Sequence, residues 1–155
     1  MKQLRIYADT SVFGGCFDKE FAEESKSLFE DIKAGKFALV ISSTTLGELE
    51  KAPDYVKKVL AELPTENVEV INFCDEIVVL RDAYLEAGIL GSEGKADAEH
   101  IAAASVADVD FVVSWNFKHI VHYEKIRGYQ AINLINGYKE IHIYSPKEVV
   151  ANEKG

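Results

Sequence analysis

The chain has 155 residues, of which 48% are hydrophobic, and this suffices for one domain with a sizeable core. Its formal net charge of −9 is opposite to the basic face of most proteins that bind long nucleic acids, which argues against a broad nucleic-acid footprint. No apolar run approaches the roughly 20 residues of a membrane-spanning helix, and no signal-peptide pattern opens the chain, so we expect a cytoplasmic protein. Cys16 and Cys74 lack CxxC spacing, and we expect free, mostly buried thiols.

The first half of the chain alternates apolar runs with amphipathic stretches. A strand is predicted over 4–8, followed by a helix over 20–33 that Gly35 ends. The continuously apolar run 37–41 is typical of a strand buried on both faces. Hydroxyl side chains at 42–45 offer N-caps to a helix through Glu50, and another helix is predicted from Pro53 to near Pro64.

The second half repeats this alternation. Strands are predicted over 68–71, 111–114 and 141–144, with helices over 75–87 and 95–106. Strands separated by helices indicate a parallel sheet covered on both faces, so we expect an α/β/α sandwich of about five strands. We expect one domain over 1–150 and a short C-terminal tail over 151–155. Three tyrosines of the late helical region either fill the core or mark a partner surface: Tyr123, Tyr129 and Tyr138.

Polar side chains fall where the predicted strands end or where a neighbouring helix begins. Asp9 follows the first strand, Glu48 lies in the helix after the second strand, and Asp97 opens the alanine-rich helix. Ser114 and Asn116 stand at the end of the fourth strand. Because ligands of open α/β sheets gather at the carboxyl ends of the strands, we expect these residues to meet at one edge. Singly, each has an ordinary explanation as a cap, a solvated residue or a partner of the helix dipole.

Together, the three acids form a cluster that repels itself unless cations occupy it. Removing any one of them should therefore barely harm stability, or even raise it. Carboxylates without cysteine or paired histidine ligands suit Mg²⁺ or Mn²⁺, which promote phosphodiester hydrolysis. Other classes with an acid after strand one fit poorly. A haloacid-dehalogenase phosphatase needs a second acid where Ser11 stands, a response-regulator receiver needs paired acids, and Gly14-Gly15 does not make a dinucleotide-binding turn.

In order and spacing, four segments resemble PIN-domain ribonucleases, and more narrowly the VapC-like toxins of type II toxin–antitoxin pairs. The segments are residues 7–11, 43–49, 95–104 and 110–119, and the resemblance covers essentially the whole chain. The first three acids of the family match Asp9, Glu48 and Asp97, whereas the fourth falls on Asn116. An asparagine can offer a carbonyl oxygen or orient a metal-bound water, but it brings no charge, so one metal ion or two stays open.

The resemblance implies an endoribonuclease with a PIN-like fold that cleaves RNA with Mg²⁺ or Mn²⁺ and leaves a 5′-phosphate. It also implies a homodimer and an antitoxin protein that blocks the pocket. The alternative is a catalytically weak or inactive PIN-like module that binds or assembles, which Asn116 and the acidic composition favour.

Several neighbours of the acids have less specific patterns. The hydroxyls of Thr10, Ser11 and Ser114 are candidates to support Asp9 or a metal-bound water. His100 and His119 could act as acid or base, although a packing role is commoner for such histidines. Glu99 is expected on a solvated face, and Trp115 and Phe117 could stack on bases or pack the loop.

Overall fold

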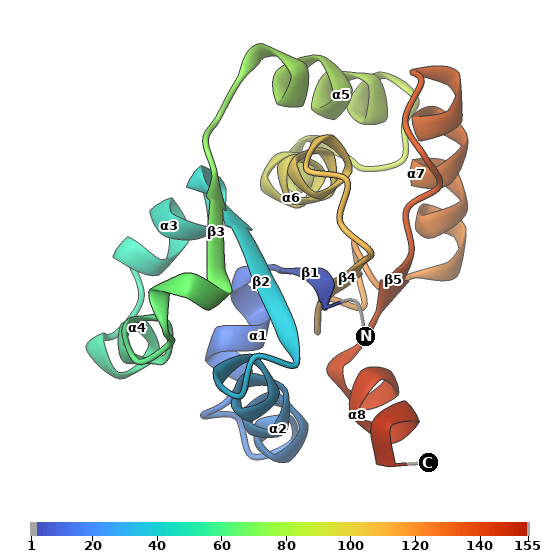
Figure 1. Cartoon of the computed structure of the whole chain (residues 1–155). Helices are drawn as coiled ribbons and strands as arrows, with labels where there is room; N and C mark the ends of the chain where they lie inside the picture. The colour runs from blue at the N-terminus through green and yellow to red at the C-terminus, as the bar shows by residue number, and fades with distance from the viewer. Residues whose placement is uncertain (1–2, 155) are drawn as a thin grey trace.

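A computed structural model describes the backbone of residues 3–154 and the side chains of residues 3–150. Its centre is a five-stranded sheet in the order β3-β2-β1-β4-β5, in which every neighbouring pair is parallel (Figure 1). This matches the predicted α/β/α sandwich with a parallel sheet of about five strands. The strands are β1 (Leu4–Ala8), β2 (Phe37–Ser42), β3 (Val68–Ile71), β4 (Phe111–Val113) and β5 (Ile143–Tyr144).

Helices cover both faces of the sheet and leave two separate hydrophobic cores (Figure 1). One core packs against α1 (Thr10–Gly15), α2 (Ala22–Lys33), α4 (Asp54–Ala61) and α8 (Pro146–Lys154), with Leu49 of α3 (Ser43–Glu50). The other packs against α5 (Asp75–Glu86), α6 (Lys95–Val106) and α7 (Tyr123–Ile135). Two single turns of 3-10 helix, η1 (Thr65–Asn67) and η2 (Ser92–Gly94), complete the elements.

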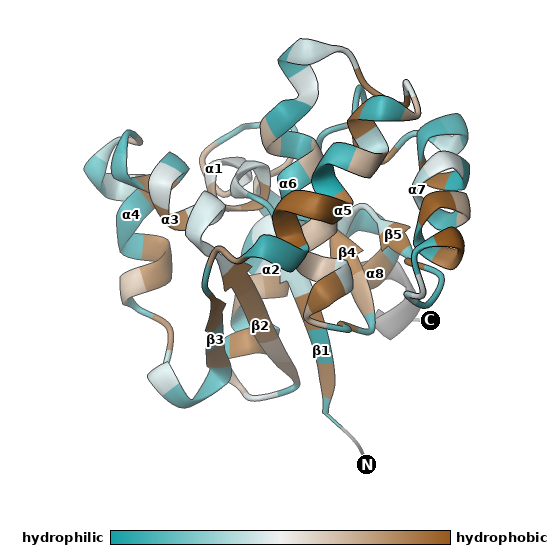
Figure 2. Ribbon diagram, turned by 90° about the horizontal axis from the view of Figure 1, so that it is seen from above, coloured by the Kyte–Doolittle hydropathy of each residue, from teal (hydrophilic) through white to brown (hydrophobic). Residues whose placement is uncertain are grey.

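Alternation along β1 divides its side chains between the two cores. Ile6 and Ala8 face the core beneath α1 and α2, and Tyr7 faces the core beneath α6. Strand β2 is apolar almost throughout and is brown along its length in Figure 2. Both strands are buried on both faces, as expected for the interior of a parallel sheet.

Helix ends follow the predicted signals. Gly35, just past α2, has a φ of +80°, a conformation that glycine adopts without steric cost. Ser42 caps α3, and its side chain and that of Thr45 form a capping box with each other's backbone. The hydroxyl-rich segment before Glu48 therefore fixes where the helix that carries this residue begins.

Two helices differ from the sequence-based expectation. Residues 10–15 form α1, a helix that was not predicted. Pro146, which lies just beyond the strand predicted over 141–144, is the first residue of the unpredicted helix α8, a position that proline favours. Helix α8 packs on α2 and runs across the predicted boundary between the domain, which ends at residue 150, and the tail over 151–155; residue 155 lies outside the described residues.

Gly15 lets the loop after β4 approach α1 closely. A Cβ atom built on Gly15 would lie 2.6 Å from Ser25 Oγ and 2.8 Å from Trp115 Nε1. Trp115 donates a hydrogen bond from Nε1 to Ser25 and stacks on Phe21 at a centroid distance of 4.1 Å. The loop behind β4 is thus held against α1 and α2.

The open questions about tyrosines and cysteines have mixed outcomes. Tyr129 is fully buried and fills the core, whereas Tyr123 is 71% exposed. Tyr138 is half-buried and donates to Glu76. Both cysteines are free as expected, but Cys74 is exposed rather than buried. Among residues 3–154, no helix is both long and apolar enough to cross a membrane.

Candidate active site

The candidate residues lie around the carboxyl end of β1, in the middle of the sheet. The chain passes from β1 to β2 and β3 on one side, and later returns to place β4 on the other side of β1. Asp9 directly follows β1, and Ser114 directly follows β4. This is the point where the strand order reverses, where open α/β sheets commonly bind ligands.

Hydroxyl groups hold the Asp9 carboxylate. Ser11 Oγ donates to Asp9 Oδ1 at 2.6 Å, and a further hydrogen bond from Ser114 favours the ionised form of Asp9. Ser11 Oγ also accepts the backbone N–H of Trp115 at 2.9 Å. The two supporting serines therefore join the start of α1 to the loop after β4.

The Glu48 carboxylate is reached from two other elements. Thr10 Oγ1 donates to Glu48 Oε1 at 2.6 Å, and His100 Nε2 lies 2.6 Å from the same oxygen. Thr10 follows Asp9 in sequence, and His100 lies one helical turn beyond Asp97. Asp9, Glu48 and Asp97 are thereby brought to one place from the junction of β1 and α1, from α3 and from α6.

Asn116 lies beside Asp97, and its side-chain oxygen already accepts a hydrogen bond within its own loop. Its Oδ1 accepts the backbone N–H of His119 at 2.9 Å. Since a backbone N–H can only donate, this contact identifies the amide oxygen and leaves Nδ2 as the donor. The hydrogen bond from Asn116 that lowers the pKa of Asp97 therefore comes from Nδ2. Asn116 thus faces Asp97 with a donor, and its carbonyl oxygen is not directed at the acids.

The pKa values reflect burial and crowding of the acids. Burial raises the pKa of Asp9 to about 6, against hydrogen bonds from its serines and the attraction of His100. Burial also raises the pKa of Asp97, and the neighbouring Glu48 adds to this increase. Although burial opposes it, the contacts with His100 and Thr10 leave the pKa of Glu48 below its usual value.

His100 supplies a positive charge within the cluster, a role that was not predicted for it. Burial acts to lower its pKa, but contacts with Tyr7, Glu48 and Asp9 raise that pKa to about 10. A charged imidazole within the acids explains how they coexist before any metal binds. It also changes what we expect for Glu48: because these contacts lower the pKa of its carboxyl, removing this acid should reduce stability rather than leave it nearly unchanged.

The carboxylate oxygens of this cluster are ligands that suit a hard divalent cation. The side chains are not, however, arranged as a preformed metal site. Within the described part of the chain, no three His, Cys, Asp or Glu side chains are placed to hold a metal ion. One oxygen of Glu48 already accepts two hydrogen bonds, and one oxygen of Asp9 accepts another. The carboxylates are near enough to shift one another's pKa, and their composition fits Mg²⁺ or Mn²⁺.

The remaining candidates near the site have structural partners. Glu99 is not solvated as expected: it accepts from Thr44 at 2.9 Å and pairs with Arg81 at 2.7 Å. Trp115 is buried and packs the loop, whereas Phe117 is 50% exposed. The sequence missed these contacts because they join residues far apart in the chain.

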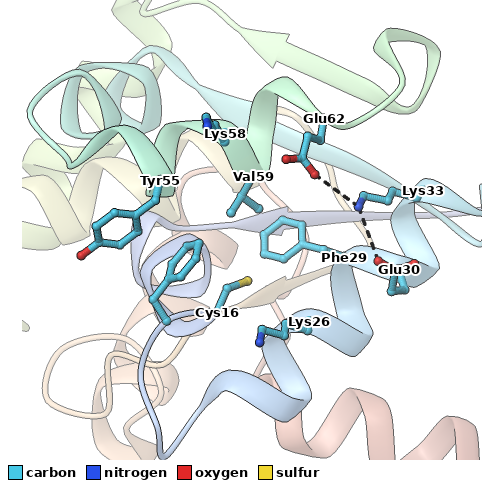
Figure 3. A pocket seen from close by; sticks show the side chains of 10 residues that line it. Cys16, Lys26, Phe29, Glu30, Lys33, Tyr55, Lys58, Val59 and Glu62 are labelled. Atoms are coloured by element: carbon cyan, nitrogen blue, oxygen red, sulfur yellow. Dashed lines mark hydrogen bonds and ion pairs between the residues drawn. The ribbon is translucent and has the colours of Figure 1, made fainter.

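A separate hollow of about 320 Å³ lies between α1, α2 and α4 (Figure 3). Phe17 and Tyr55 make an edge contact at its rim, and each ring is about half exposed, at 49% and 54%. Lys26 and Lys58 also line it, and none of the three clustered acids does.

Comparison with solved structures gives the same fold. A chain in the crystal structure of promoter-bound VapBC2 from Rickettsia felis is 16% identical with a TM-score of 0.56, covering 92% of this chain and 98% of the other. One in DNA-bound VapBC from Salmonella typhimurium is 19% identical with a TM-score of 0.55, covering 93% and 99%. One in FitAcB from Neisseria gonorrhoeae is 12% identical with a TM-score of 0.58, covering 91% and 97%.

No protein-family model and no curated protein matches the sequence. The likeness therefore concerns the fold, and it extends over nearly the full length of both partners in each pair. The chain therefore has a PIN-like α/β/α fold, which it shares with chains of these VapBC and FitAcB structures.

Proposed function

We propose that this protein is a metal-dependent endoribonuclease whose cluster of Asp9, Glu48 and Asp97 binds Mg²⁺ or Mn²⁺. The observation that carries the proposal is the convergence of these acids from β1–α1, α3 and α6, linked through Thr10 and His100. A bound divalent ion would polarise the scissile phosphate and lower the pKa of a water molecule.

The chain's own residues prepare the site for that chemistry. Ser11 and Ser114 favour the ionised form of Asp9, so that burial does not leave the acid fully protonated near neutral pH. Asn116 donates to Asp97 and orients it. Because Asn116 adds no charge and its oxygen is taken by His119, we propose that one metal ion binds rather than two.

The rival is a PIN-like module without catalysis, and one feature favours it. The fourth acid position holds an asparagine that is engaged in its loop, and no three described acids or histidines form a preassembled metal cluster. Such a module would keep the fold and bind partners without cleaving RNA.

A cleavage assay distinguishes the two. The full chain is incubated with single-stranded RNA and Mn²⁺, Mg²⁺ or EDTA, beside Asp9→Asn as the matched control. We expect cleavage with either metal, none with EDTA, and products that carry a 5′-phosphate. Absence of cleavage with both metals, for a protein that is folded by circular dichroism, would establish the rival.

We also propose an antitoxin partner, a homodimer and a cytoplasmic location. Two of the similar structures are VapBC assemblies with DNA, and a short gene for a DNA-binding protein beside this one would identify the partner.

The hollow of Figure 3 offers this partner exposed rings and lysines. Co-purification with that gene product should be lost in Tyr55→Asp and kept in Val79→Asp, which changes another exposed apolar residue. Sedimentation of the purified chain tests the dimer.

A further inference from the structure

His100 is the buried centre of a hydrogen-bonded chain that ends on Glu48. The residue is only 1% exposed, and both ring nitrogens have partners. Nδ1 lies 2.6 Å from the Tyr7 hydroxyl, and Nε2 lies 2.6 Å from Glu48 Oε1. The imidazole therefore cannot turn about its ring axis without losing contacts at both ends.

Tyr7 is itself fixed by the helix that carries Glu48. Its hydroxyl lies 2.7 Å from Ser42 Oγ, the N-cap of α3, and 3.3 Å from Thr45 Oγ1. Tyr7 is fully buried on β1, and His100 comes from α6. The chain of contacts thus joins β1, α3 and α6, the elements that also supply or precede the three acids.

These hydrogen bonds hold one of the two carboxylate oxygens of Glu48. Oε1 accepts from Thr10 and His100, both at 2.6 Å, while the side chain as a whole is 40% exposed. A glutamate with that exposure would ordinarily sample several rotamers. Two short contacts on one oxygen restrict those rotamers and direct the second oxygen, Oε2, away from His100.

We propose that His100, backed by Tyr7, is a positioning residue that holds Oε1 of Glu48 and thereby presents Oε2 to the divalent cation. This inference rests on the proposed function, since it assumes that Glu48 is a metal ligand. Outer-shell partners of metal ligands commonly orient them in this way. A purely structural histidine would stabilise the core equally well but would leave metal affinity unchanged when replaced.

The test measures Mn²⁺ affinity of the full chain by electron paramagnetic resonance, without RNA. His100→Leu removes the donor to Glu48, and His100→Gln keeps one, because a glutamine amide reaches the place of Nε2. Tyr7→Phe removes only the hydroxyl behind the ring. The matched control is Tyr84→Phe, a fully buried tyrosine of the same core whose hydroxyl contacts Ser105 and Asn133 instead.

We expect His100→Leu to weaken Mn²⁺ binding by about 10- to 100-fold, as the loss of an outer-shell partner does. His100→Gln should recover most of that loss, Tyr7→Phe should show a smaller loss, and Tyr84→Phe should bind as the wild type does. If His100→Leu does not fold, the Mn²⁺ affinities of His100→Gln and Tyr7→Phe are compared with that of Tyr84→Phe, and this comparison still tests the positioning role.

Two outcomes overturn the inference and are distinct from each other. If the wild type binds Mn²⁺ and the His100 and Tyr7 variants bind equally well, the positioning role is wrong and the proposed function stands. If the wild type binds no Mn²⁺, the metal-dependent function and the positioning role both fail.

Discussion

The two ends of β1 carry opposite charges in contrasting surroundings. At its start, Arg5 makes a bidentate pair with Glu69 at 2.9 and 3.0 Å and donates to the carbonyl of Ala107 at 2.9 Å. At its end, Asp9 is buried among other acids and its pKa is raised to about 6. A charge matched by its neighbours serves the fold, whereas an excess of one sign, kept at a cost, is typical of a functional site.

The largest expected effect is the loss of RNA cleavage when one of the clustered acids is removed. Asp97→Asn and Asp9→Asn should each lower the rate of RNA cleavage by more than about 100-fold, the upper cost of losing a mere outer-shell partner. Initial rates on single-stranded RNA at saturating Mn²⁺ measure this. A variant that keeps a tenth of the activity would remove that residue from the metal site.

The next effect is on stability and depends on pH. Because the pKa of Asp9 is raised from 3.8 to about 6, the folded state holds a proton that the unfolded state loses, so wild-type stability falls as pH rises through this interval. Asp9→Asn should match the wild type near pH 4 and exceed it by about 3 kcal/mol above pH 6.5. Urea unfolding in EDTA measures both, and equal stability of the two proteins at pH 7.5 would contradict the burial argument.

Glu48 provides the matched control for this experiment. Its pKa is lowered by contacts with His100 and Thr10, so its charge contributes stability that is present above its ordinary pKa and lost on acidification. Glu48→Gln should therefore destabilise the protein at pH 7.5, the opposite sign to Asp9→Asn.

A smaller effect is expected at the other end of the strand. Arg5→Met should lower the free energy of unfolding by about 1–2 kcal/mol, because charge-assisted hydrogen bonds are lost. The loss is no larger because the guanidinium is partly exposed. RNA cleavage should be unchanged. If cleavage falls with Arg5→Met while the protein stays folded, the two ends of β1 are not as separate as the charges indicate.

The smallest effect concerns the missing fourth acid. Asn116→Asp keeps the oxygen that accepts from His119 but replaces the donor facing Asp97 with a second negative charge. Stability in EDTA should fall by roughly 0.5–1 kcal/mol, and Mg²⁺ should raise the melting temperature more than in the wild type. An identical response to Mg²⁺ in both proteins would argue against any metal near residue 116.

Most of the fold was predictable because the patterns are local. The helix over 95–106 and the strand over 68–71 have the predicted bounds. Helix α1 was missed because Gly14 and Gly15 lower helix propensity, while the close approach of Trp115, which requires a glycine at 15, is a tertiary feature.

The acids of the site were predictable from the sequence, but the hydrogen-bond partners that position them were not. Asp9, Glu48 and Asp97 could be placed from strand ends and helix starts, since parallel strands share one carboxyl edge. The contact between Tyr7 and His100 joins residues separated by 93 positions, and no periodicity encodes it. The turn in which Asn116 accepts from His119 is local, and asparagine's tendency to bond nearby backbone could have indicated it.

The order of the strands has a consequence for synthesis on the ribosome. Strand β1 is made first, yet one of its two neighbours is β4, and the loop that supplies Ser114 and Asn116 follows only then. A nascent chain that ends before this loop holds Asp9 and Glu48 but lacks a partner on one side of β1. The cluster of Asp9, Glu48 and Asp97, with the loop that borders it, would thus be assembled only once most of the chain has been synthesised.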